Sequence, residues 1–443
     1  MFEKKIKSLD KYYSTNIFIK RPDKYREIEN ISLNADTLIT MGSANSYTAA
    51  SFKKNSLSIM FEKFDRIIDF NKENKTITVE AGMKISDFLN YTLKHKLWIP
   101  QIPGYPSITI GGAVASNAHG KSCGFHGSIK NQITKILIFH KNHGWLNLSK
   151  NENKEIFELT IGGLGLTGTV VNVEFKLLDF LGYNFTTSIE NSTSAKDTVK
   201  KINIKEPKEI YSYSWNRADK KNNFGKGFIF KNELNPNHEK KINDEINFET
   251  KKIHNFSPLN LWNQFSIRFF HSLYFNYYKN LKSKSFDDSF KNVIFPFIGK
   301  EIYFQMFGKK GFIESQILVP FDKTDIFLDE FEYLFNNEMP SITLFTIKKM
   351  VGNQNYLRFE DNGICFTFDF INNKKNLLFM DKLDVLCKKY KLLPSIIKDS
   401  RLSLETVSTC YENYDNFKDN LINFDKKRTY RSELSDRIGL WNI

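Results

Sequence analysis

Glycine is distributed very unevenly along this chain, and this distribution constrains the fold more than any other feature. Eleven of the 22 glycines fall between Gly104 and Gly168, a stretch that holds three separate clusters. Glycine is favoured where the backbone turns tightly or approaches a ligand closely. Hairpin turns in a β-rich domain would explain some of these residues but not three clusters in one stretch. The pattern therefore predicts a backbone cradle for a ligand in the first half of the chain.

The composition is that of a globular protein without a nucleic-acid partner. With 443 residues the chain can form two or three packed units, and its 41 Phe and 19 Tyr predict large cores. The net charge of +14 comes from scattered lysines, which no RNA- or DNA-binding motif accompanies. The four cysteines lack the spacing of a metal site or of a disulfide framework. From the cysteine spacing we therefore expect no metal. The N-terminal segment lacks an apolar signal core, so we expect a cytoplasmic protein.

Two regions of different character follow each other along the chain. Up to about residue 180, short strands alternate with helical patterns such as Ile85–Lys94, which predicts an α+β or α/β domain. After that point glycine thins out and aromatic strands are expected at residues 227–230 and 303–307. The alternating run Phe312–Pro320 predicts a further strand, and helical patterns follow at residues 325–336 and 377–390. These elements predict a second domain, a sheet with helices packed on one side.

The first candidate loop directly follows a short strand and consists mainly of small residues. It comprises Gly42, Ser43, Ala44, Asn45, Ser46 and Tyr47. Consecutive backbone N–H groups of such residues form a concavity that accepts phosphate oxygens. An ordinary turn would account for the same residues.

The second candidate loop spans residues 103–121 and carries the densest small-residue pattern. Gly111 and Gly112, followed by small residues, suit a helix start that packs closely against a ligand. Asp and Glu are absent from residues 101–151, so an anionic ligand would meet no repulsion there. His119 and Lys121 would form a polar tip beside the ligand, although a structural histidine is the alternative.

The third candidate loop, residues 162–168, has the sequence Gly-Gly-Leu-Gly-Leu-Thr-Gly. By spacing alone it could be taken for a dinucleotide-binding fingerprint. That motif, however, opens a long helix early in its domain, whereas this loop lies late and precedes a strand. An interpretation as a Rossmann domain from this motif alone would therefore be wrong.

Taken together, the three loops resemble the FAD-binding domain of the vanillyl-alcohol oxidase / p-cresol methylhydroxylase superfamily. Within it, the chain is similar to the decaprenylphosphoryl-β-D-ribose 2′-oxidase family from end to end. The segments that carry the resemblance are residues 98–104, 111–121, 162–168, 311–320 and 397–401. The resemblance implies an α+β, PCMH-type FAD-binding domain of two subdomains at residues 1–180. It further implies a substrate domain at 181–390, an antiparallel sheet covered by helices, and a C-terminal segment at 391–443 that returns to the FAD domain and the active site.

The same resemblance implies a reaction and a set of site residues. FAD would take a hydride at its N5 atom from a secondary hydroxyl carbon of a sugar, in that family the 2′-hydroxyl of a ribose linked to a lipid phosphate. Lys398 and His119 would be catalytic. Lys121, Gln316, Lys349 and either Cys365 or Thr367 would bind the substrate. The FAD-binding residues would be Gly42, Ser43, Ala44, Asn45, Ser46, Gly104, Thr109, Gly111, Gly112, Ser116, His119, Gly120, Gly165, Thr167 and Gly168.

Three positions depart from the pattern. Asn45 stands where many superfamily members carry a histidine bonded covalently to the flavin, so we expect non-covalent FAD. Glu314 replaces an uncharged amide, and Ser395 replaces an aromatic hydroxyl shortly before Lys398. These departures leave FAD binding intact but bear on the identity of the sugar.

The expected substrate is a sugar or a polyprenyl-phosphate sugar, with a separate reductase returning the hydride to complete an epimerisation. The aromatic segment at residues 259–278 would either contact the inner face of an anionic membrane or form an ordinary core helix. Two alternative functions are open. One is a soluble alditol or aldonolactone oxidase of the same superfamily, and the other is a flavin-binding homologue without catalysis.

Overall fold

The computed structural model describes all residues except 181, 205–208, 236–247, 249–256, 258 and 443. The expected domain boundary at residue 181 lies outside the described residues. Among the described residues, none of the helices combines the length and the apolar character needed to cross a bilayer.

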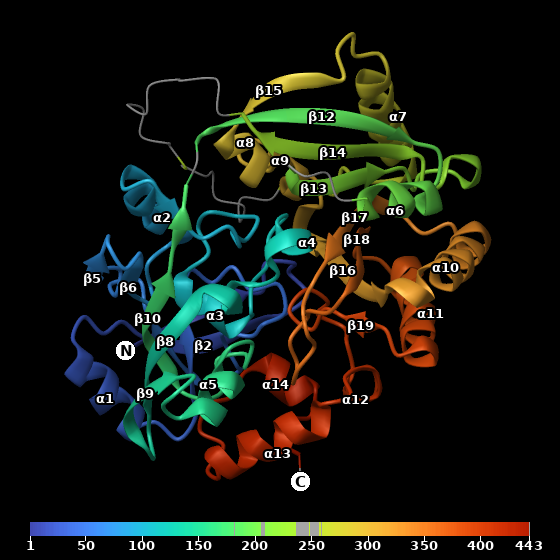
Figure 1. Cartoon of the computed structure of the whole chain (residues 1–443). Helices are drawn as coiled ribbons and strands as arrows, with labels where there is room; N and C mark the ends of the chain where they lie inside the picture. The colour runs from blue at the N-terminus through green and yellow to red at the C-terminus, as the bar shows by residue number, and fades with distance from the viewer. Residues whose placement is uncertain (181, 205–208, 236–247, 249–256, 258, 443) are drawn as a thin grey trace.

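The N-terminal part contains two sheets of different topology (Figure 1). The first has the order β1(Phe2–Lys7), β2(Ser14–Lys20), β4(Leu57–Met60), β3(Leu38–Met41). In it β1 and β2 are antiparallel, while β4 runs parallel to both β2 and β3. The second, antiparallel sheet has the order β5(Ile67–Asn71), β6(Thr76–Glu80), β10(Thr169–Lys176), β8(Ile133–His140), β9(Gly144–Ser149). The helices are α1(Tyr25–Leu33), α2(Ile85–Lys94), α3(Ile110–Ala115), α4(Cys123–His126) and α5(Lys154–Thr160), and the short strands β7(Leu97–Trp98) and β11(Leu178–Asp179) pair with each other.

Two antiparallel four-stranded sheets follow (Figure 1). One has the order β13(Glu209–Asn216), β14(Gly227–Leu234), β12(Asn184–Ser192), β15(Ser285–Ser289). The other has the order β17(Ile342–Met350), β18(Gly363–Ile371), β16(Phe312–Pro320), β19(Leu393–Pro394). The helices of this part are α6(Ala195–Asn203), α7(Gln264–Lys279), α8(Phe290–Ile294), α9(Ile302–Gln305), α10(Thr324–Glu338) and α11(Lys374–Tyr390). The two sheets meet where β13 lies beside β17. There the Ser214 hydroxyl of β13 accepts a hydrogen bond from the Ile347 N–H of β17 (3.0 Å).

Strand β18 shows why one face of its sheet is apolar and the other polar. Successive side chains of a strand point to opposite faces. Phe366, Phe368 and Phe370 point toward the helices, where Phe331 of α10 stacks on Phe368 with ring centroids 4.5 Å apart. The alternate residues Cys365, Thr367 and Asp369 therefore point to the opposite face of the sheet.

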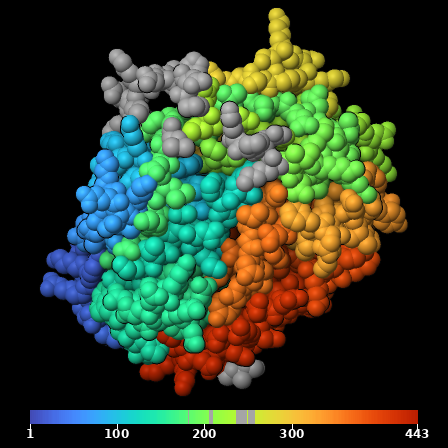
Figure 2. Space-filling view, in the orientation of Figure 1, coloured from blue at the N-terminus to red at the C-terminus, as the bar shows by residue number. Residues whose placement is uncertain are grey.

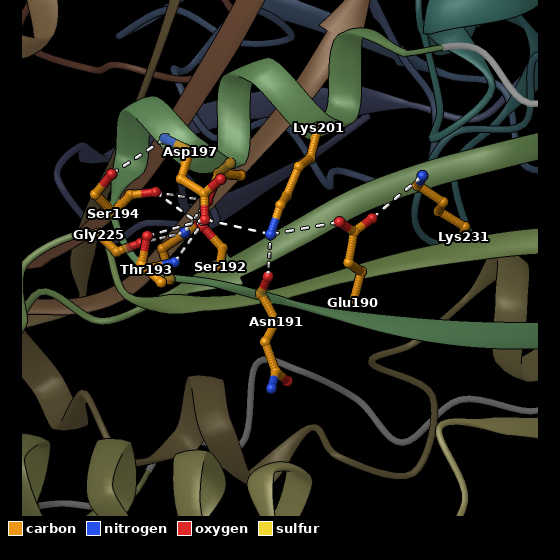
Figure 3. A network of polar contacts seen from close by, with 11 residues as sticks. Glu190, Asn191, Ser192, Thr193, Ser194, Asp197, Lys201, Gly225 and Lys231 are labelled. Carbon is orange, nitrogen blue, oxygen red and sulfur yellow. Dashed lines mark hydrogen bonds and ion pairs between the residues drawn. The ribbon is translucent and has the colours of Figure 1, made fainter.

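Helix α6 is fixed against β12 by a polar network (Figure 3). The Ser194 hydroxyl caps the helix by accepting from the backbone N–H of Asp197 (3.1 Å). Lys201, one turn further along, donates to the Asn191 carbonyl (2.7 Å) and forms an ion pair with Glu190 (3.4 Å). These contacts hold α6 against strand β12.

The strand predicted at residues 303–307 is wrong, because the chain forms helix α9 there. Phe304 and Phe307 are three residues apart and both buried, and this spacing places them on one side of a helical turn. They pack with Trp262, whose ring centroid lies 5.9 Å from that of Phe307. Burial of both aromatic rings on one side is incompatible with an alternating strand.

The C-terminal segment contacts both parts of the molecule and lies in red along the base of the face shown in Figure 2. It contains α12(Leu404–Cys410), α13(Tyr414–Phe424) and α14(Glu433–Arg437). Strand β19 pairs with β16 in the second part. The Tyr430 hydroxyl donates to the Phe139 carbonyl (3.1 Å), and the Arg431 N–H donates to the Leu38 carbonyl (3.0 Å) in the first part.

Candidate active site

The three glycine-containing loops meet at one cavity. Its empty volume is about 1120 Å3, part of which is open to solvent. The predicted site residues that line it are Gly42, Ser43, Ala44, Asn45, Ser46, Thr109, Gly111, Gly112, Ser116, Gly165, Gly168 and Lys398. Loops that are far apart in the sequence are thus brought together with the C-terminal segment around one space.

The backbone of these loops leaves no room for larger residues where they meet. A Cβ atom on Gly42 would lie 2.2 Å from the Thr109 hydroxyl oxygen, which caps α3 by accepting from the Gly112 N–H (3.3 Å). Gly165 and Gly168 have φ angles of +76° and +127°, a region that side chains disfavour. The loops therefore form a close-fitting concavity of backbone groups, which suits the pyrophosphate and ring system of a dinucleotide.

Asn45 ties the first loop to the second. Its side-chain amide donates to the Ser107 hydroxyl (2.8 Å) and to the Ser107 carbonyl (3.3 Å). Among the described residues that line the cavity there is no histidine or cysteine that could bond covalently to a flavin.

Four predicted cofactor residues are not among the residues that line the cavity, namely Gly104, His119, Gly120 and Thr167. Gly104 is exposed, with no atom within 4 Å of a Cβ placed there. Gly120 is buried, and a Cβ there would lie 2.1 Å from the Ile102 carbonyl oxygen. The Thr167 hydroxyl lies 2.9 Å from that of Thr160 inside the core. Gly120 and Thr167 therefore shape the loops from behind, and nothing in the structure assigns Gly104 to the cavity.

Lys398 joins the cavity to the polar face of the second part. Its Nζ atom lies 3.2 Å from Oε1 of Glu314 and 4.0 Å from the centre of the Tyr47 ring. The Gln316 amide donates to the same Glu314 oxygen (2.6 Å). The Lys398 ammonium is thus held by a carboxyl group and an aromatic face, and Lys398 also lines the cavity.

Asp369 extends this polar cluster. The Tyr303 hydroxyl donates to its Oδ2 atom (2.8 Å), whereas its buried Oδ1 has no hydrogen-bond partner among the described residues. Burial and the neighbouring charge of Glu314 raise the pKa of Asp369 well above its usual value. Burial, Glu314 and Asp369 likewise raise the pKa of Tyr47. The raised pKa favours the protonated form of Asp369, which can act as a hydrogen-bond donor.

His119 lies beside Phe359, with ring centroids 5.7 Å apart. Both ring nitrogens are buried and lack a hydrogen-bond partner among the described residues. Burial, together with the charges of Lys348 and Lys398, lowers the pKa of His119 well below its usual value. The imidazole is therefore neutral at neutral pH, and its unpartnered nitrogens fit a ligand that supplies the missing partner.

Cys365 and Thr367, the two alternative substrate-binding candidates on β18, point to the same side of the sheet. The structure therefore does not separate one from the other. The Cys365 sulfur lies 4.0 Å from the Thr367 hydroxyl, as residues two apart on a strand require. Thr367 is directly opposite Gln316 of β16. Cys365, Thr367 and Gln316 therefore share the polar face with Asp369.

Lys349 of β17 was predicted to bind the substrate, but the neighbouring Lys348 is the residue that faces the same side as Cys365. Lys349 points to the helix side, where its ammonium donates to the Asn203 carbonyl (3.4 Å) and lies 5.7 Å from the centre of the Phe321 ring. Lys348 is directly opposite Cys365 and shares its face. Lys348, rather than Lys349, therefore lies on the same face as Cys365.

Lys121 is committed to contacts away from the cavity wall. Its ammonium donates to the Val293 carbonyl (2.6 Å) and lies 4.1 Å from the centre of the Tyr213 ring. Burial, and then the charge of Lys300, lowers the pKa of Lys121 well below its usual value.

Sequence reasoning missed four members of the cluster, namely Tyr47, Tyr303, Lys348 and Asp369. Tyr47 is the last residue of the first loop but was assigned no role, and its place in that loop is the signal that could have revealed it. Strand alternation from Thr367 could likewise have revealed Asp369. Tyr303 lies in the segment predicted as a strand, which concealed its direction.

Comparison with known proteins agrees with this geometry. Residues 21–149 match a family model described as an FAD binding domain. The chain is 22% identical over 419 residues to decaprenylphosphoryl-beta-D-ribose oxidase of Mycolicibacterium smegmatis, covering 91% of this chain and 89% of that protein. It is 27% identical over 111 residues to L-gulonolactone oxidase of Mus musculus, which is 25% of each protein. It is 22% identical over 170 residues to D-arabinono-1,4-lactone oxidase of Debaryomyces hansenii, covering 35% of this chain and 30% of that protein.

The fold, the site and these comparisons define a class. The chain carries a PCMH-type FAD-binding domain in an α+β fold, and FAD is its cofactor. It is an FAD-dependent oxidoreductase related to decaprenylphosphoryl-beta-D-ribose oxidase and to the sugar lactone oxidases. The predicted cofactor and the predicted enzyme class are both confirmed.

Proposed function

We propose that this enzyme oxidises a secondary hydroxyl of a sugar that is linked to a lipid phosphate. The observation that carries the proposal is the position of Lys398, which lines the cavity of the three loops and forms an ion pair with Glu314 (3.2 Å) on the polar face. The reacting carbon would lie between the loops and this face. The similarity along 91% of the chain to an oxidase named for a decaprenylphosphoryl ribose supports the substrate class.

The chain's own residues would handle the hydroxyl proton. When bound, FAD supplies a two-electron acceptor that takes a hydride from a carbinol carbon at N5. The ammonium of Lys398 would hold the substrate oxygen by a charge-assisted hydrogen bond. The neutral imidazole of His119, whose nitrogens lack partners, would accept the proton that leaves the hydroxyl.

The polar face would bind the sugar and exclude water. Gln316 and Thr367 offer an amide and a hydroxyl to the sugar hydroxyls, and Asp369 in its protonated form offers a donor. Lys348 takes the role expected for Lys349 and would attract a phosphate. Lys121 would hold the adjacent segment at Val293 in place for the substrate.

We further propose that FAD is bound non-covalently. Asn45 is engaged with Ser107 and cannot form a covalent bond to the flavin. The ketone product would require a separate reductase if the reaction is half of an epimerisation.

The first experiment is the visible spectrum of the purified protein before and after acid precipitation. Yellow chromophore that stays in the supernatant supports non-covalent FAD, whereas flavin that pellets with the protein overturns it. The holoenzyme is then mixed anaerobically with a polyprenyl-phosphate ribose and, separately, with free alditols and aldonolactones. Flavin bleaching by the lipid-linked sugar alone supports the proposal. Bleaching by the free compounds alone would assign the enzyme to the lactone oxidase type.

The variant Lys398→Met tests the residue that carries the proposal. It removes the ammonium but keeps an unbranched side chain, so the flavin spectrum should persist. We expect the rate of flavin bleaching to fall by about a thousandfold, as on loss of a charged donor in the transition state. The matched control is Lys349→Met, whose ammonium lies on the helix side of β17 and should not affect the rate. Equal rates in the wild type and in Lys398→Met would refute the assignment.

A further inference from the structure

Helix α7 has one face packed on the protein and one apolar face exposed. On the packed side Ile267 and His271 are buried, and Phe275 and Tyr278 contact the sheet of β12 to β15. The residues Phe265, Phe269, Leu273 and Tyr277 recur every four positions on the other side and are 80%, 55%, 56% and 61% exposed. We call these four residues the α7 outer face.

The exposed apolar surface continues beyond α7. Leu259 and Leu261, just before the helix, are 67% and 48% exposed, and Ile302 of α9 is 66% exposed. These residues are neighbours, because the Leu261 N–H donates to the Met306 carbonyl (2.8 Å) next to α9. Contiguous apolar surface of this kind marks an interaction site rather than scattered surface residues.

The charged residues within the segment 259–286 all have one sign. Residues 259–286 contain no Asp or Glu, but they contain Arg268, Lys279, Lys282 and Lys284. Arg268 and Lys279 are exposed and lie three turns apart on one flank of the outer face. Lys309 and Lys310, exposed in the turn after α9, add to this basic rim, since that turn packs against Leu259.

We propose that the α7 outer face and its basic rim dock this protein onto an anionic lipid bilayer. The helix lies along the surface of its domain, so its four apolar side chains can enter the acyl boundary while Arg268 and Lys279 meet lipid phosphates. The segment forms the upper edge of the molecule, in yellow, and projects from it (Figures 1 and 2).

The charge pattern favours a bilayer over a second copy of the chain. A two-fold contact through the α7 outer face would bring Arg268 and Lys279 close to their own copies. Like charges facing each other across an interface oppose association. Anionic lipid headgroups instead neutralise the whole basic rim. The proposal concerns the surface alone and does not depend on which sugar the enzyme oxidises.

The test is flotation of the FAD-loaded full-length protein with lipid vesicles, in the absence of any sugar. We expect binding to vesicles of phosphatidylcholine mixed with phosphatidylglycerol and much weaker binding to phosphatidylcholine alone. The variant Phe265→Ser/Phe269→Ser/Leu273→Ser should reduce the bound fraction about tenfold or more. The matched control, Leu378→Ser/Val385→Ser on α11, removes side chains that are 54% and 60% exposed and should bind like the wild type.

A second variant tests the charges without touching the apolar residues. Arg268→Gln/Lys279→Gln/Lys282→Gln should lower binding to the anionic vesicles to the level seen with phosphatidylcholine. Raising the ionic strength from about 0.1 M to about 0.5 M should have a similar effect on the wild type. The flavin spectrum and the melting temperature verify the fold of each variant.

Three outcomes would overturn the proposal. One is failure of the wild-type holoprotein to float with anionic vesicles. Another is equal flotation of the wild type and of both variants. The third is a dimer in sedimentation that the triple serine variant converts to a monomer without any change in vesicle binding, which would assign the α7 outer face to a second copy.

Discussion

At the scale of single residues, the charge of Glu314 beside Lys398 distinguishes this site. The Glu314 side chain is only 8% exposed, and its carboxyl lies 3.2 Å from the lysine ammonium that lines the cavity. A carboxylate so close partly cancels the positive charge that Lys398 offers to the flavin and to the substrate. The residue therefore tunes the electrostatics of the cavity through its lysine partner.

We predict that Glu314→Gln makes the midpoint potential of the bound flavin more positive. The amide keeps the shape of the side chain but no longer offsets the ammonium, so the reduced and more negative flavin is favoured. The expected shift is about 30 mV, equivalent to about 1.4 kcal/mol for a two-electron couple. The measurement is a spectroelectrochemical titration of the holoprotein. Glu330→Gln, which breaks an exposed ion pair with Lys389, is the control. An unchanged potential in a fully flavin-loaded Glu314→Gln would show that the carboxyl does not act on the cavity.

Asp10 gives a second prediction, for stability against pH. Burial raises the pKa of Asp10 from 3.8 to about 6, although the Tyr12 N–H donates to it (2.9 Å). The folded state therefore holds this proton more tightly than the unfolded state. Between pH 4 and pH 6 the folded protein binds more protons, so its free energy of unfolding falls as the pH rises.

The variant Asp10→Asn removes this titration. The difference in free energy of unfolding, wild type minus variant, should fall by about 2–3 kcal/mol between roughly pH 4 and pH 6. Urea unfolding across that range measures it. Asp179→Asn, which alters an exposed carboxylate paired with Lys75, should give a difference that does not depend on pH in this way. Parallel curves for wild type and Asp10→Asn would contradict the assigned pKa.

At the scale of elements, the convergence of the loops rests on glycines of unequal importance. Gly42 has the Thr109 hydroxyl 2.2 Å from where its Cβ would stand, whereas Gly104 has no atom within 4 Å. We predict that Gly42→Ala weakens FAD binding at least about tenfold, because Thr109 must give up its cap on α3 or the first loop must move. Gly104→Ala should bind FAD like the wild type. Fluorescence titration of the apoprotein with FAD measures both. Equal affinities for the two variants would show that the first loop does not hold the cofactor.

The sequence predicted a helix or a loop well where the residues of that segment alone determine its structure. Helix α2 has the predicted bounds Ile85–Lys94, and the three loops were each recognisable from their small residues. The direction of side chains on β17 could not be predicted, because Lys348 and Lys349 are adjacent and identical. Which one faces the cavity depends on pairing with β18, where Lys348 lies opposite Cys365. The contact between Tyr303 and Asp369 was likewise hidden, since it joins residues 66 positions apart.

At the scale of the whole molecule, residues 358–360 connect the second part to two of the FAD-binding loops. Arg358 is fully buried, and its guanidinium donates to the Ile161 carbonyl (2.9 Å), directly before the third loop. Glu360 accepts from the Asn117 amide (2.9 Å) in the second loop. The shape of the cavity is therefore coupled to the packing of the second part.

We predict from this coupling that Arg358→Met lowers the melting temperature and the temperature of flavin release together. The substitution leaves the Ile161 carbonyl without its buried donor. It also removes one of the two cations of the Glu158 carboxylate, which lies 2.8 Å from Arg358 and 3.7 Å from Lys130. A buried acceptor that loses its donor costs about 1–3 kcal/mol. Flavin fluorescence and far-ultraviolet circular dichroism, followed in the same thermal scan, should shift to the same lower temperature. Lys389→Met, which removes an exposed cation near Glu330, is the control and should shift neither signal.

If flavin release stayed at the wild-type temperature while the dichroism signal moved, the third loop would be independent of Arg358. The cavity would then be built by the N-terminal part alone, and the two parts of the chain would contribute separately to cofactor binding and to the site for the sugar.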